Sequence, residues 1–415
     1  MKYILIGAGS RGMTYGCCAR DLGIEIAAVA ELRPDRLEHA GTALHVPPHM
    51  CFRDGDDLLA LGRIADAAII ATMDRDHYRH VMKALECGYD ILLEKPISPD
   101  PRECIAIEEK ANALGRSITV CHVLRYAPFF MELKRILSSG ELGKIVAIKH
   151  SENIGNFHMA HSFVRGNWRN DRLSSPIILQ KSCHDLDILL WLTDSHCKKV
   201  AAFGSLTYFQ PRNAPEGSAE RCLDCQYAGS CRFDAWQCYQ PMLGKWPADV
   251  VCLEQTEDAL KKALRTGPYG RCVYKCDNNV CDHMSVAMEF DDGITATFSL
   301  TAQTSDIHRN IHIMCENGEI EADDLNGTIT VTHFRRNQAE ASQSRNITLG
   351  NRLDGHGGGD EAIMADFTAG LREKAGESRS SISRSVESHL MACAIEESRL
   401  TGKIIDMGQF RSSLT

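Results

Sequence analysis

The sequence predicts an α/β fold in two unequal parts. The first is an N-terminal Rossmann domain with a doubly wound parallel sheet, and the second is a C-terminal α+β domain with a large open, mostly antiparallel sheet. The 415 residues exceed what one ordinary hydrophobic core organises. Strand and helix patterns alternate up to residue 121, whereas strand patterns dominate after it. We therefore place the domains at residues 1–121 and 122–415.

The first part alternates short apolar runs with helical patterns. These runs are apolar at nearly every position, which is typical of parallel strands whose two faces are both covered by helices. We expect strands at residues 3–6, 26–30, 67–71, 91–93 and 118–121. This alternation predicts the Rossmann domain.

After residue 121 the pattern changes to a helix followed by strands. The helix is expected over residues 129–138, and Gly140 is placed to end it. Residues 207–280 are rich in Pro, Gly and Cys with little periodicity, so we interpret them as an inserted module without an apolar core of its own. Two helices are expected near the C-terminus, after residue 360 and over 383–401. The expected strands and hairpin turns are 145–150, 200–206, 285–290, 295–300, 311–315 and 328–333, with turns at 291–293 and 316–318.

A glycine-rich turn follows the first strand and opens a helix. Gly7, Gly9 and Gly12 have the Gly-x-Gly-x-x-Gly spacing of a dinucleotide-binding turn, with Ser10 and Arg11 between them. Gly7 permits the tight turn, Gly9 lets the backbone approach a pyrophosphate, and Gly12 lets helix and strand pack closely. The helix N-terminus then stabilises the phosphate charge. This context predicts a nicotinamide dinucleotide site, with a ligand-free turn as the alternative.

Glu31 ends the second strand at the position where an acid accepts hydrogen bonds from the adenosine ribose. A carboxylate there also repels a 2′-phosphate, so NAD is favoured over NADP. Arg33 could instead meet that phosphate, which keeps NADP as the less favoured alternative.

Polar residues stand directly after later strands, where the ligand crevice of an open α/β sheet lies. Thr72 and His77 follow the third expected strand, and Glu94 and Lys95 follow the fourth. We expect all four near the cofactor. A lysine beside the nicotinamide can bond the reacting oxygen and move its proton. A surface lysine at a proline turn is the alternative.

The Gly-rich turn, Glu94-Lys95-Pro96 and the segments 122–126 and 183–187 occur in one order along the chain. In this the sequence resembles the glucose-fructose oxidoreductase, inositol dehydrogenase and MocA (Gfo/Idh/MocA) family, except in the cysteine-rich insert. The resemblance implies a second domain whose open sheet faces the nicotinamide and often mediates oligomerisation, here to a homo-oligomer such as a dimer or tetramer. Family members mostly act on sugars, cyclitols or their glycosides with NAD or NADP.

The resemblance also implies roles for individual residues. Lys95 matches the lysine of the family's Glu-Lys-Pro motif, which positions substrate and assists proton transfer. His184 and Asp187 match its His-x-x-Asp motif, in which the histidine commonly serves as acid or base. We therefore expect Lys95 and His184 to be catalytic. A neutral imidazole suits this role because its unperturbed pKa of about 6.5 lies close to working pH.

The chain departs from the family at Gln180, where many sugar dehydrogenases carry an aspartate. Lys181 either takes over that position toward a sugar hydroxyl or pairs with Asp185 or Asp187. His356 opens a loop of three glycines that can approach a ligand, and a flexible turn is the alternative there. The expected substrate contacts are Arg125, Tyr126, Lys181, Asp187 and His356.

Cysteines cluster in the inserted module. Cys222 and Cys225 form a Cys-x-x-Cys pair, Cys231 follows, and Cys272 or Cys276 is placed to supply a fourth thiolate. Structural zinc is the leading prediction. An iron–sulfur cluster uses the same ligands and is the alternative, as are buried free thiols. Four thiolates leave no open coordination position, so we expect the metal to have no catalytic role.

The overall charge narrows the partners and the location. A formal net charge of -9 and a pI near 6.0 argue against nucleic acid and anionic membranes, both of which need a concentrated basic surface. No apolar run approaches the roughly 20 residues of a membrane-spanning helix. The N-terminus enters a strand directly instead of forming a secretory signal. We expect a cytoplasmic protein with reduced cysteines.

These features predict an NAD-dependent oxidoreductase that acts on a hydroxyl of a carbohydrate or glycoside. Two alternatives stay open. One is a redox-neutral glycosidase, in which transient oxidation acidifies a neighbouring proton, elimination follows and the hydride returns. The other is a non-catalytic NAD(H)-binding sensor, which the presence of Lys95, His184 and Asp187 disfavours.

Overall fold

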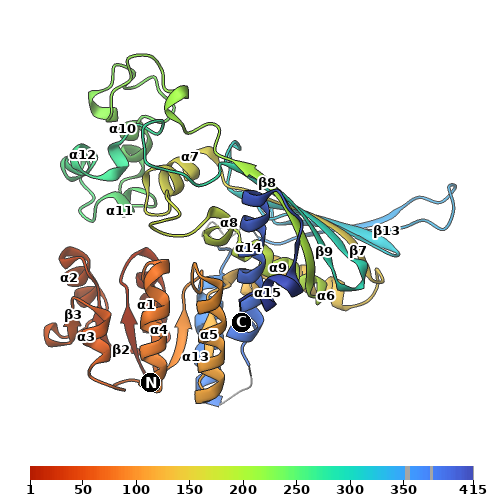
Figure 1. Cartoon of the computed structure of the whole chain (residues 1–415), viewed down its shortest axis with the longest axis horizontal. Coiled ribbons are helices and arrows are strands. Elements are labelled where there is room, and N and C mark those ends of the chain that lie inside the picture. The colour runs from red at the N-terminus through yellow and green to blue at the C-terminus, as the bar shows by residue number, and fades with distance from the viewer. Residues whose placement is uncertain (351–355, 374–376, 415) are drawn as a thin grey trace.

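The computed structural model describes residues 1–350, 356–373 and 377–414, and it contains two β-sheets with helices packed on them (Figure 1). The first sheet is built entirely from residues before 121, and the larger second sheet from residues after 144. This confirms the predicted fold class, a Rossmann domain followed by an α+β domain with an open sheet.

The first sheet has six parallel strands, which are β1 (Lys2–Ile6), β2 (Glu25–Ala30), β3 (Cys51–Phe52), β4 (Ala67–Ile70), β5 (Asp90–Leu93) and β6 (Ile118–Val120). Their order is β3-β2-β1-β4-β5-β6. Strand order reverses between β1 and β4, which places a ligand crevice at the carboxyl ends of these two strands. The sequence did not predict β3 because a two-residue strand leaves no readable period.

Helices cover both faces of this sheet, which is why its strands are almost wholly apolar. The covering helices from the same part of the chain are α1 (Ser10–Asp21), α2 (Pro34–Ala43), α3 (Gly55–Leu59), α4 (His77–Glu86) and α5 (Pro101–Leu114). A further helix, α13 (Gly359–Glu373), returns from near the C-terminus and packs against α1 (Figure 1). Its Phe367 meets Tyr3 of β1, with ring centroids 5.8 Å apart.

The second sheet has nine strands, which are β7 (Ile145–Asn153), β8 (Cys197–Ser205), β9 (His283–Phe290), β10 (Thr295–Thr301), β11 (His308–Cys315), β12 (Gly318–Asp323), β13 (Thr328–His333), β14 (Gln343–Thr348) and β15 (Ile405–Asp406). Their order is β14-β13-β12-β11-β7-β10-β9-β8-β15. Only the β10–β7 pairing is parallel among these, so the predicted antiparallel character is correct. Three strands, β12, β14 and β15, were not predicted.

One face of the second sheet packs on helices and the other is open. The helices are α6 (Pro128–Ser138), α8 (Ile177–Gln180), α9 (Cys183–Thr193), α14 (Ile382–Thr401) and α15 (Met407–Ser412). Helix α14 lies against β8 and α9. On the strands, buried and exposed residues alternate, as in β9 and β10, because only alternate side chains face the helices.

The inserted module folds into short helices that stand above the first sheet in Figure 1. They include α10 (Ala235–Tyr239), α11 (Ala248–Val251) and α12 (Glu257–Thr266). The expectation that the module lacks an apolar core is wrong. Ala235, Tyr239, Leu260 and Leu264 are fully buried and pack together with Cys222. The amphipathic period of α12 supplies two of these residues, a signal that the Pro- and Gly-rich composition obscured.

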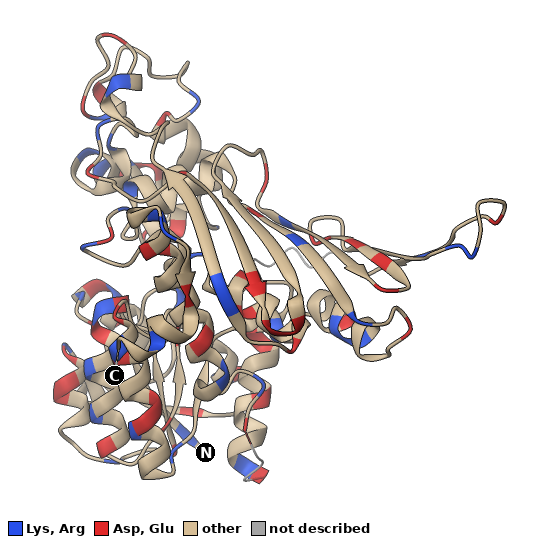
Figure 2. Cartoon of the chain, turned by 45° about the vertical axis from the view of Figure 1, so that its right-hand side comes forward, with Lys and Arg blue, Asp and Glu red and all other residues tan. Residues whose placement is uncertain are grey.

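Charged residues are spread over both parts of the molecule, with Lys and Arg interspersed among Asp and Glu (Figure 2). Among the residues that the structure describes, no helix has the length and apolar character needed to cross a membrane.

Candidate functional site

The glycine-rich turn lies at the carboxyl end of β1 and leads into α1. Gly7 has a φ of +89°, and a Cβ at this position would lie 2.5 Å from the carbonyl oxygen of Ala71 at the end of β4. A Cβ at Gly12 would lie 1.9 Å from the Gly7 carbonyl oxygen. Both positions therefore require glycine for the fold itself.

Gly9 differs because a Cβ there would meet only the Arg36 side chain, at 3.6 Å. Gly9 precedes the first helical residue, Ser10, and the helix start has neither a side-chain cap nor an acidic residue in its first turn. The first backbone N–H groups of α1, including those of Ser10 and Arg11, are thus left for a ligand. This open, uncapped N-terminus fits the pyrophosphate of a dinucleotide.

Glu31 follows β2 and holds the turn in place. Its carboxylate accepts hydrogen bonds from the backbone N–H groups of Ala8, at 2.9 Å, and Arg33, at 3.0 Å. The Arg33 guanidinium pairs with Asp35 at 2.5 Å. The hydrogen bond from Arg33 holds the pKa of Asp35 below its usual range. The cation that could meet a 2′-phosphate is therefore already paired.

Arg11 and Glu94 form a buried ion pair, 2.7 Å long, between α1 and the end of β5. Burial would raise the pKa of Glu94, but the charges of Arg11 and Lys95 outweigh it and keep that pKa below its ordinary value. The Arg11 guanidinium also pairs with Asp360 of α13 at 2.5 Å. The side chains of Arg11 and Glu94 both bind partners within the protein. The group that Arg11 can offer a cofactor is therefore its backbone N–H.

Thr72 and His77 lie between the ends of β4 and β5. His77 is buried, and its ring nitrogens contact the carbonyl oxygens of Pro96, at 2.7 Å, and Thr72, at 3.2 Å. These contacts place His77 as a link between the two strand ends, directly beside Lys95.

Lys95 lies at the end of the first sheet and contacts the second part of the chain. Its ammonium donates a hydrogen bond to the carbonyl oxygen of Gln180, at 2.6 Å, at the end of α8. Gln180 is itself buried, and its side-chain oxygen has no hydrogen-bond partner in the structure. Lys95 therefore lies next to a buried acceptor that a ligand could satisfy.

His184 lies in the first turn of α9, four residues after Gln180. It is 4% exposed, and its Nδ1 has no hydrogen-bond partner among the described residues. Burial, followed by the charge of Lys95, places the pKa of His184 well below its ordinary value. The imidazole is thus neutral at pH 7 and able to accept a proton. Its ring lies beside the rings of His122, at 5.7 Å, and His356, at 5.9 Å between centroids.

His122 was noted at a strand end but not predicted as a site residue. It follows β6 and is fully buried. Among the described residues neither ring nitrogen has a hydrogen-bond partner, although Nε2 lies 3.8 Å from the Asp187 carboxylate. Burial, together with Arg125, depresses the pKa of His122 well below its ordinary value. Its position after β6, at the carboxyl edge of the sheet, is the signal that could have identified it.

Lys181 does not pair with Asp185 or Asp187, so that expectation is wrong. Its ammonium pairs with Glu152 of β7 at 2.9 Å. Glu152 is fully buried and also pairs with Arg309, at 2.5 Å, which in turn pairs with Asp185 at 2.8 Å. This chain has Gln180 where many sugar dehydrogenases of the family carry an aspartate. A carboxylate from the sheet, that of Glu152, lies next to Lys181 instead.

Three residues that were predicted to contact substrate form hydrogen bonds with one another or with other residues of the protein. Arg125 donates to Asp187 through Nε, at 2.6 Å, and Nη2, at 2.7 Å, and both side chains are almost fully buried. The Tyr126 hydroxyl lies 3.2 Å from both Asp366 and Ser380, and burial raises its pKa to about 12. These residues hold the segment after β6 against α9.

His356 begins the described part of the glycine-rich loop, since residues 351–355 lie outside the described residues. Its Nδ1 lies 3.0 Å from the Asp360 carboxylate. Asp360 is thereby shared between His356 and Arg11. The structure brings Lys95, His184 and His356 to one place at the end of the first sheet.

The predicted metal ligands only partly come together. Cys222, Cys225, Cys231 and Cys272 line one small cavity of about 30 Å³. Cys276 does not line it, and its thiol contacts the Cys272 carbonyl oxygen at 3.3 Å. Among the described residues, no three of these sulfurs lie within 4.8 Å of one another.

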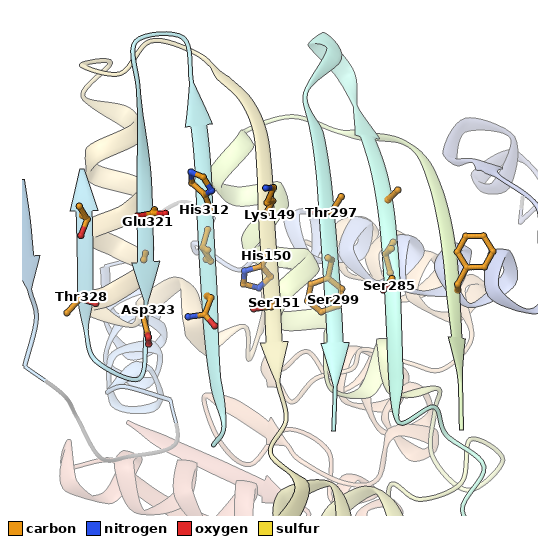
Figure 3. A pocket seen from close by; sticks show the side chains of 18 of the residues that line it. Lys149, His150, Ser151, Ser285, Thr297, Ser299, His312, Glu321, Asp323 and Thr328 are labelled. Carbon is orange, nitrogen blue, oxygen red and sulfur yellow. The ribbon is translucent and has the colours of Figure 1, made fainter. Parts of the chain in front are cut away.

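Two other features lie away from Lys95. A hollow of about 800 Å³ lies on the open face of the second sheet, where its lining includes Lys149, Thr297 and His312 (Figure 3). No predicted cofactor, catalytic or substrate residue that the structure describes lines this hollow. It is therefore separate from the candidate site.

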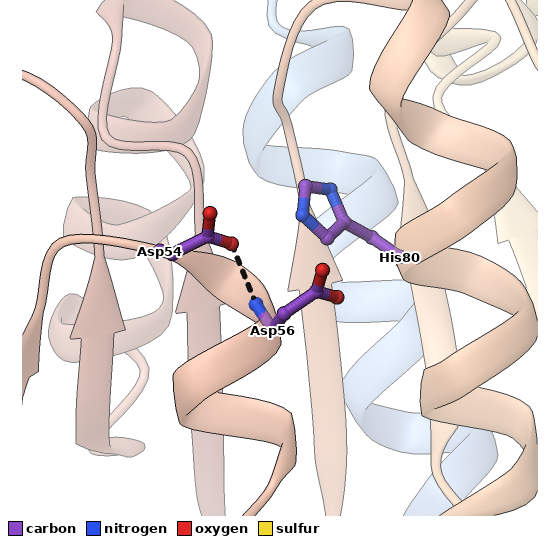
Figure 4. Close-up of side chains that lie close together, drawn as sticks. All are labelled: Asp54, Asp56 and His80. Atoms are coloured by element: carbon purple, nitrogen blue, oxygen red, sulfur yellow. Dashed lines mark hydrogen bonds between the residues drawn. The ribbon is translucent and has the colours of Figure 1, made fainter.

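The second feature is a cluster of Asp54, Asp56 and His80 in the first sheet's helices (Figure 4). Asp54 accepts the Asp56 N–H at 2.8 Å, which caps α3. Arg79 pairs with both carboxylates, and Lys83 lies 3.5 Å from Asp56. Because protein cations already balance the charge, we assign no metal to this cluster.

Two family models match the chain. One, described as an oxidoreductase family with an NAD-binding Rossmann fold, matches residues 1–122. The other, described as the C-terminal α/β domain of the oxidoreductase family, matches residues 134–407. Together they span most of the chain.

Individual relatives agree with this match. YteT of Bacillus subtilis, named as an oxidoreductase, is 24% identical over 76% of this chain and 74% of its own length. Inositol 2-dehydrogenase of Corynebacterium glutamicum is 28% identical over 47% of this chain, which spans only 55% of that relative. An inositol dehydrogenase homolog complexed with NAD⁺ from Azotobacter vinelandii has a TM-score of 0.71 at 17% identity, with 98% and 97% of the chains covered. That likeness shows the fold.

Proposed function

The chain belongs to the Gfo/Idh/MocA family of oxidoreductases with an NAD-binding Rossmann fold, and from this premise we propose that it oxidises a hydroxyl of a carbohydrate, cyclitol or glycoside with NAD. The observation that carries the proposal is the meeting of Lys95 with a buried, neutral His184. Gln180 and His122 add buried polar atoms without partners at the same place. Unpaired buried polar atoms are costly unless a ligand satisfies them.

A nicotinamide dinucleotide held by the Gly-rich turn and Glu31 would supply the hydride acceptor for the carbon that carries the hydroxyl. Lys95 donates a hydrogen bond to the reacting oxygen and stabilises the negative charge that develops on it. His184 accepts the hydroxyl proton, since its imidazole is neutral and its Nδ1 has no partner among the described residues. In the reverse direction His184 returns the proton.

The proposed cofactor is NAD and not NADP. Glu31 lies at the end of β2 and would accept hydrogen bonds from the adenosine ribose while repelling a 2′-phosphate. Arg33, the cation that could neutralise that phosphate, lies in an exposed ion pair with Asp35. We expect a lower KM for NAD than for NADP.

The proposal is tested by incubating the protein with NAD and a panel of cyclitols, sugars and aryl glycosides while recording NADH. The proposal is supported if NADH accumulates with a carbohydrate and this accumulation requires His184. His184→Asn should abolish the signal, whereas Lys110→Met, a change in a surface ion pair with Glu86, should leave it intact. Tight NAD binding with no turnover of any panel member would favour the sensor function instead.

A second candidate, the redox-neutral glycosidase, is favoured by one observation. The His122 and His356 rings both lie near the His184 ring, at 5.7 and 5.9 Å between centroids, so the site holds more than one group able to move protons. Elimination after oxidation needs a second proton transfer, from the carbon next to the new carbonyl. In the assay with aryl glycosides, this reaction would release phenol without accumulating NADH.

We also propose that the open face of the second sheet forms a contact between copies of the chain. Phe203 is 77% exposed on this face and lines the large hollow. Light scattering of the purified protein would show a dimer or tetramer. Phe203→Lys should shift the equilibrium toward the monomer, because it places a charge in a buried interface.

A further inference from the structure

We propose that Cys222, Cys225, Cys231 and Cys272 bind an iron–sulfur cluster, and that the buried guanidinium of Arg165 balances its negative charge. The proposal does not depend on the proposed oxidoreductase activity. It rests on the convergence of the four sulfurs, on the burial of Arg165 and on the spacing between the sulfurs.

The four cysteines come from three segments that the fold brings to one cavity. Cys222 and Cys225 lie on a single turn, in which the Cys225 N–H donates to the Cys222 carbonyl oxygen at 3.2 Å. An antiparallel bridge between Arg221 and Arg271 places Cys222 beside Cys272. Cys272 thus lies near Cys222 and Cys225 although it is 50 residues after Cys222 along the chain. Ligands of a metal centre commonly combine a close pair with a distant residue in this way.

Arg165 is 1% exposed and lines the same cavity. Its guanidinium donates to the carbonyl oxygens of Arg271 and Phe233, both at 2.7 Å, and to the sulfur of Cys222 at 3.3 Å. Among the described residues, no carboxylate oxygen lies within the 4.0 Å of an ion pair with it. Asp234, the acidic residue in the cavity wall, instead accepts the N–H groups of Gly229 and Trp236.

A buried arginine without an anionic partner is costly, because the guanidinium keeps its charge under all ordinary conditions. Four neutral thiols would not compensate that charge. Four thiolates bound to metal would, because metal–thiolate centres with four cysteines carry net negative charge. The burial of Arg165 therefore indicates that these cysteines are metal-bound thiolates rather than free thiols.

The spacing of the sulfurs distinguishes a cluster from one zinc ion. Zinc holds its sulfurs at about 2.3 Å in a tetrahedron, which places them roughly 3.8 Å from one another. No three cysteine sulfurs of the described residues lie within 4.8 Å of one another. A cluster binds each thiolate through a different iron and so holds the four sulfurs further apart. The described sulfurs are thus spread more widely than one zinc ion requires, which favours the cluster.

Two neighbouring cysteines provide matched controls. The Cys276 thiol contacts the Cys272 carbonyl oxygen at 3.3 Å, and the Cys238 thiol lies 3.6 Å from the Arg232 carbonyl oxygen. Neither lines the cavity. Cys276→Ser and Cys238→Ser should therefore retain the cluster, whereas Cys272→Ser should lose it.

The experiment is anaerobic purification of the full chain, followed by measurement of iron, acid-labile sulfide and zinc and by visible absorption spectroscopy. We expect about four irons and about four sulfides per chain, with the broad visible absorption of a cluster. The Cys272→Ser chain should lose most of the iron and sulfide, and the two control variants should keep them. One zinc per chain without sulfide, or a chain that forms no cluster even after reconstitution, would overturn the proposal.

Protein purified without metal is also reconstituted anaerobically with ferrous iron and sulfide, which separates loss during purification from an absent site. Arg165→Met should shorten the lifetime of the reconstituted visible absorption in air several-fold relative to Cys276→Ser. Equal lifetimes would contradict the role of Arg165. If Cys272→Ser does not fold, Cys231→Ser gives the same comparison, and thermal unfolding followed by circular dichroism reports whether each variant is folded.

Discussion

At the scale of single residues, burial and pairing decide which charged side chains near the cleft can meet a ligand. Arg125 and Asp187 are almost fully buried and satisfy each other through two hydrogen bonds. The ammonium of Lys95 donates to one backbone carbonyl, that of Gln180, and an ammonium has three donors. Lys95, and not Arg125, is therefore the cation that can bind a reacting oxygen.

Replacing Lys95 by Met should lower kcat/KM about 100- to 1,000-fold, the usual cost of removing a donor that stabilises negative charge developing on an oxygen. The affinity for NAD should stay nearly the same, because the Gly-rich turn and Glu31 are untouched. Steady-state kinetics with a turned-over substrate and a fluorescence titration with NAD measure the two effects. Retention of kcat/KM within a few-fold would exclude Lys95 from catalysis.

The Arg125–Asp187 pair makes a different prediction, because both partners are buried. Asp187→Asn should lower the free energy of unfolding by about 3–5 kcal/mol, since it leaves a buried guanidinium without its anion. Urea denaturation measures this change. Glu25→Gln is the matched control: its ion pair with Lys2 is 2.9 Å long but exposed, so the change there should be about 0–1 kcal/mol. Equal effects of the two variants would contradict a stabilising role for the pair.

At the scale of elements, different glycines of the turn between β1 and α1 serve folding and ligand binding. A Cβ at Gly12 would overlap the Gly7 carbonyl oxygen, whereas one at Gly9 meets only a flexible arginine side chain. Gly9 also has a φ of -68°, which any residue adopts. The same motif thus contains two glycines required by the fold, Gly7 and Gly12, and one, Gly9, that is free to serve a ligand.

Gly9→Ala should therefore fold normally but weaken NAD binding about tenfold or more, a loss of about 1.4 kcal/mol. Gly12→Ala should lower both the melting temperature and NAD affinity, because α1 must shift away from β1. Thermal unfolding and NAD titration of both variants test this. Wild-type NAD affinity in Gly9→Ala would show that the pyrophosphate does not approach this turn.

Most elements of the first sheet could be predicted because strands buried on both faces, such as β4, are continuous apolar runs. The second sheet was harder where that signal fails. In β12 only alternate positions are buried over a short span, and β14 is exposed at nearly every position, so neither shows a clear apolar pattern. The two-residue β15 exists only through its pairing with β8.

The candidate site could be predicted where motifs carry it, as at Lys95 and His184. Pairings between distant residues could not. Arg125 and Asp187 are 62 positions apart, and Glu152 reaches Lys181 only because β7 runs beneath α8. Sequence spacing contains no information on contacts that the packing of α9 and β7 creates.

At the scale of the whole molecule, the first sheet and the second part of the chain are tied together by polar contacts. Arg11 pairs with Asp360 of α13, and Lys95 donates to Gln180. Ser174 and Ser175 donate to the buried carboxylate of Asp74, at 2.9 and 2.7 Å. Because two of these contacts involve Arg11 and Lys95, the candidate site depends on the docking of the two parts.

Seven histidines of the described residues have pKa values below the ordinary value; those of His80 and His356 are lowered, and those of five others are shifted furthest. Burial depresses the pKa values of His161 and His389 to about 3, with Arg165 adding to the effect at the first and His122 at the second. His122, His158 and His184 are shifted in the same direction, also chiefly by burial. All five are neutral in the folded protein and charged in the unfolded chain below pH 6.5.

The free energy of unfolding should therefore fall as pH is lowered from 7 to 5, because the unfolded chain binds protons that the folded protein does not. Each such histidine contributes a loss of about 2 kcal/mol over this range. Urea denaturation at the two pH values measures the sum. In this window the carboxylates with lowered pKa values, such as Asp277 and Asp360, stay ionised in both states and do not contribute.

Two variants separate the histidines from other causes. His389→Gln should make the loss between pH 7 and 5 smaller by about 2 kcal/mol, because one buried neutral imidazole is removed. His196 is exposed, and its hydrogen bond with Glu387 raises its pKa, so its stabilising effect is present at low pH and disappears as pH rises through that pKa. His196→Gln should therefore make the loss between pH 7 and 5 larger, not smaller. An unchanged loss in His389→Gln would show that its imidazole is protonated in the folded protein.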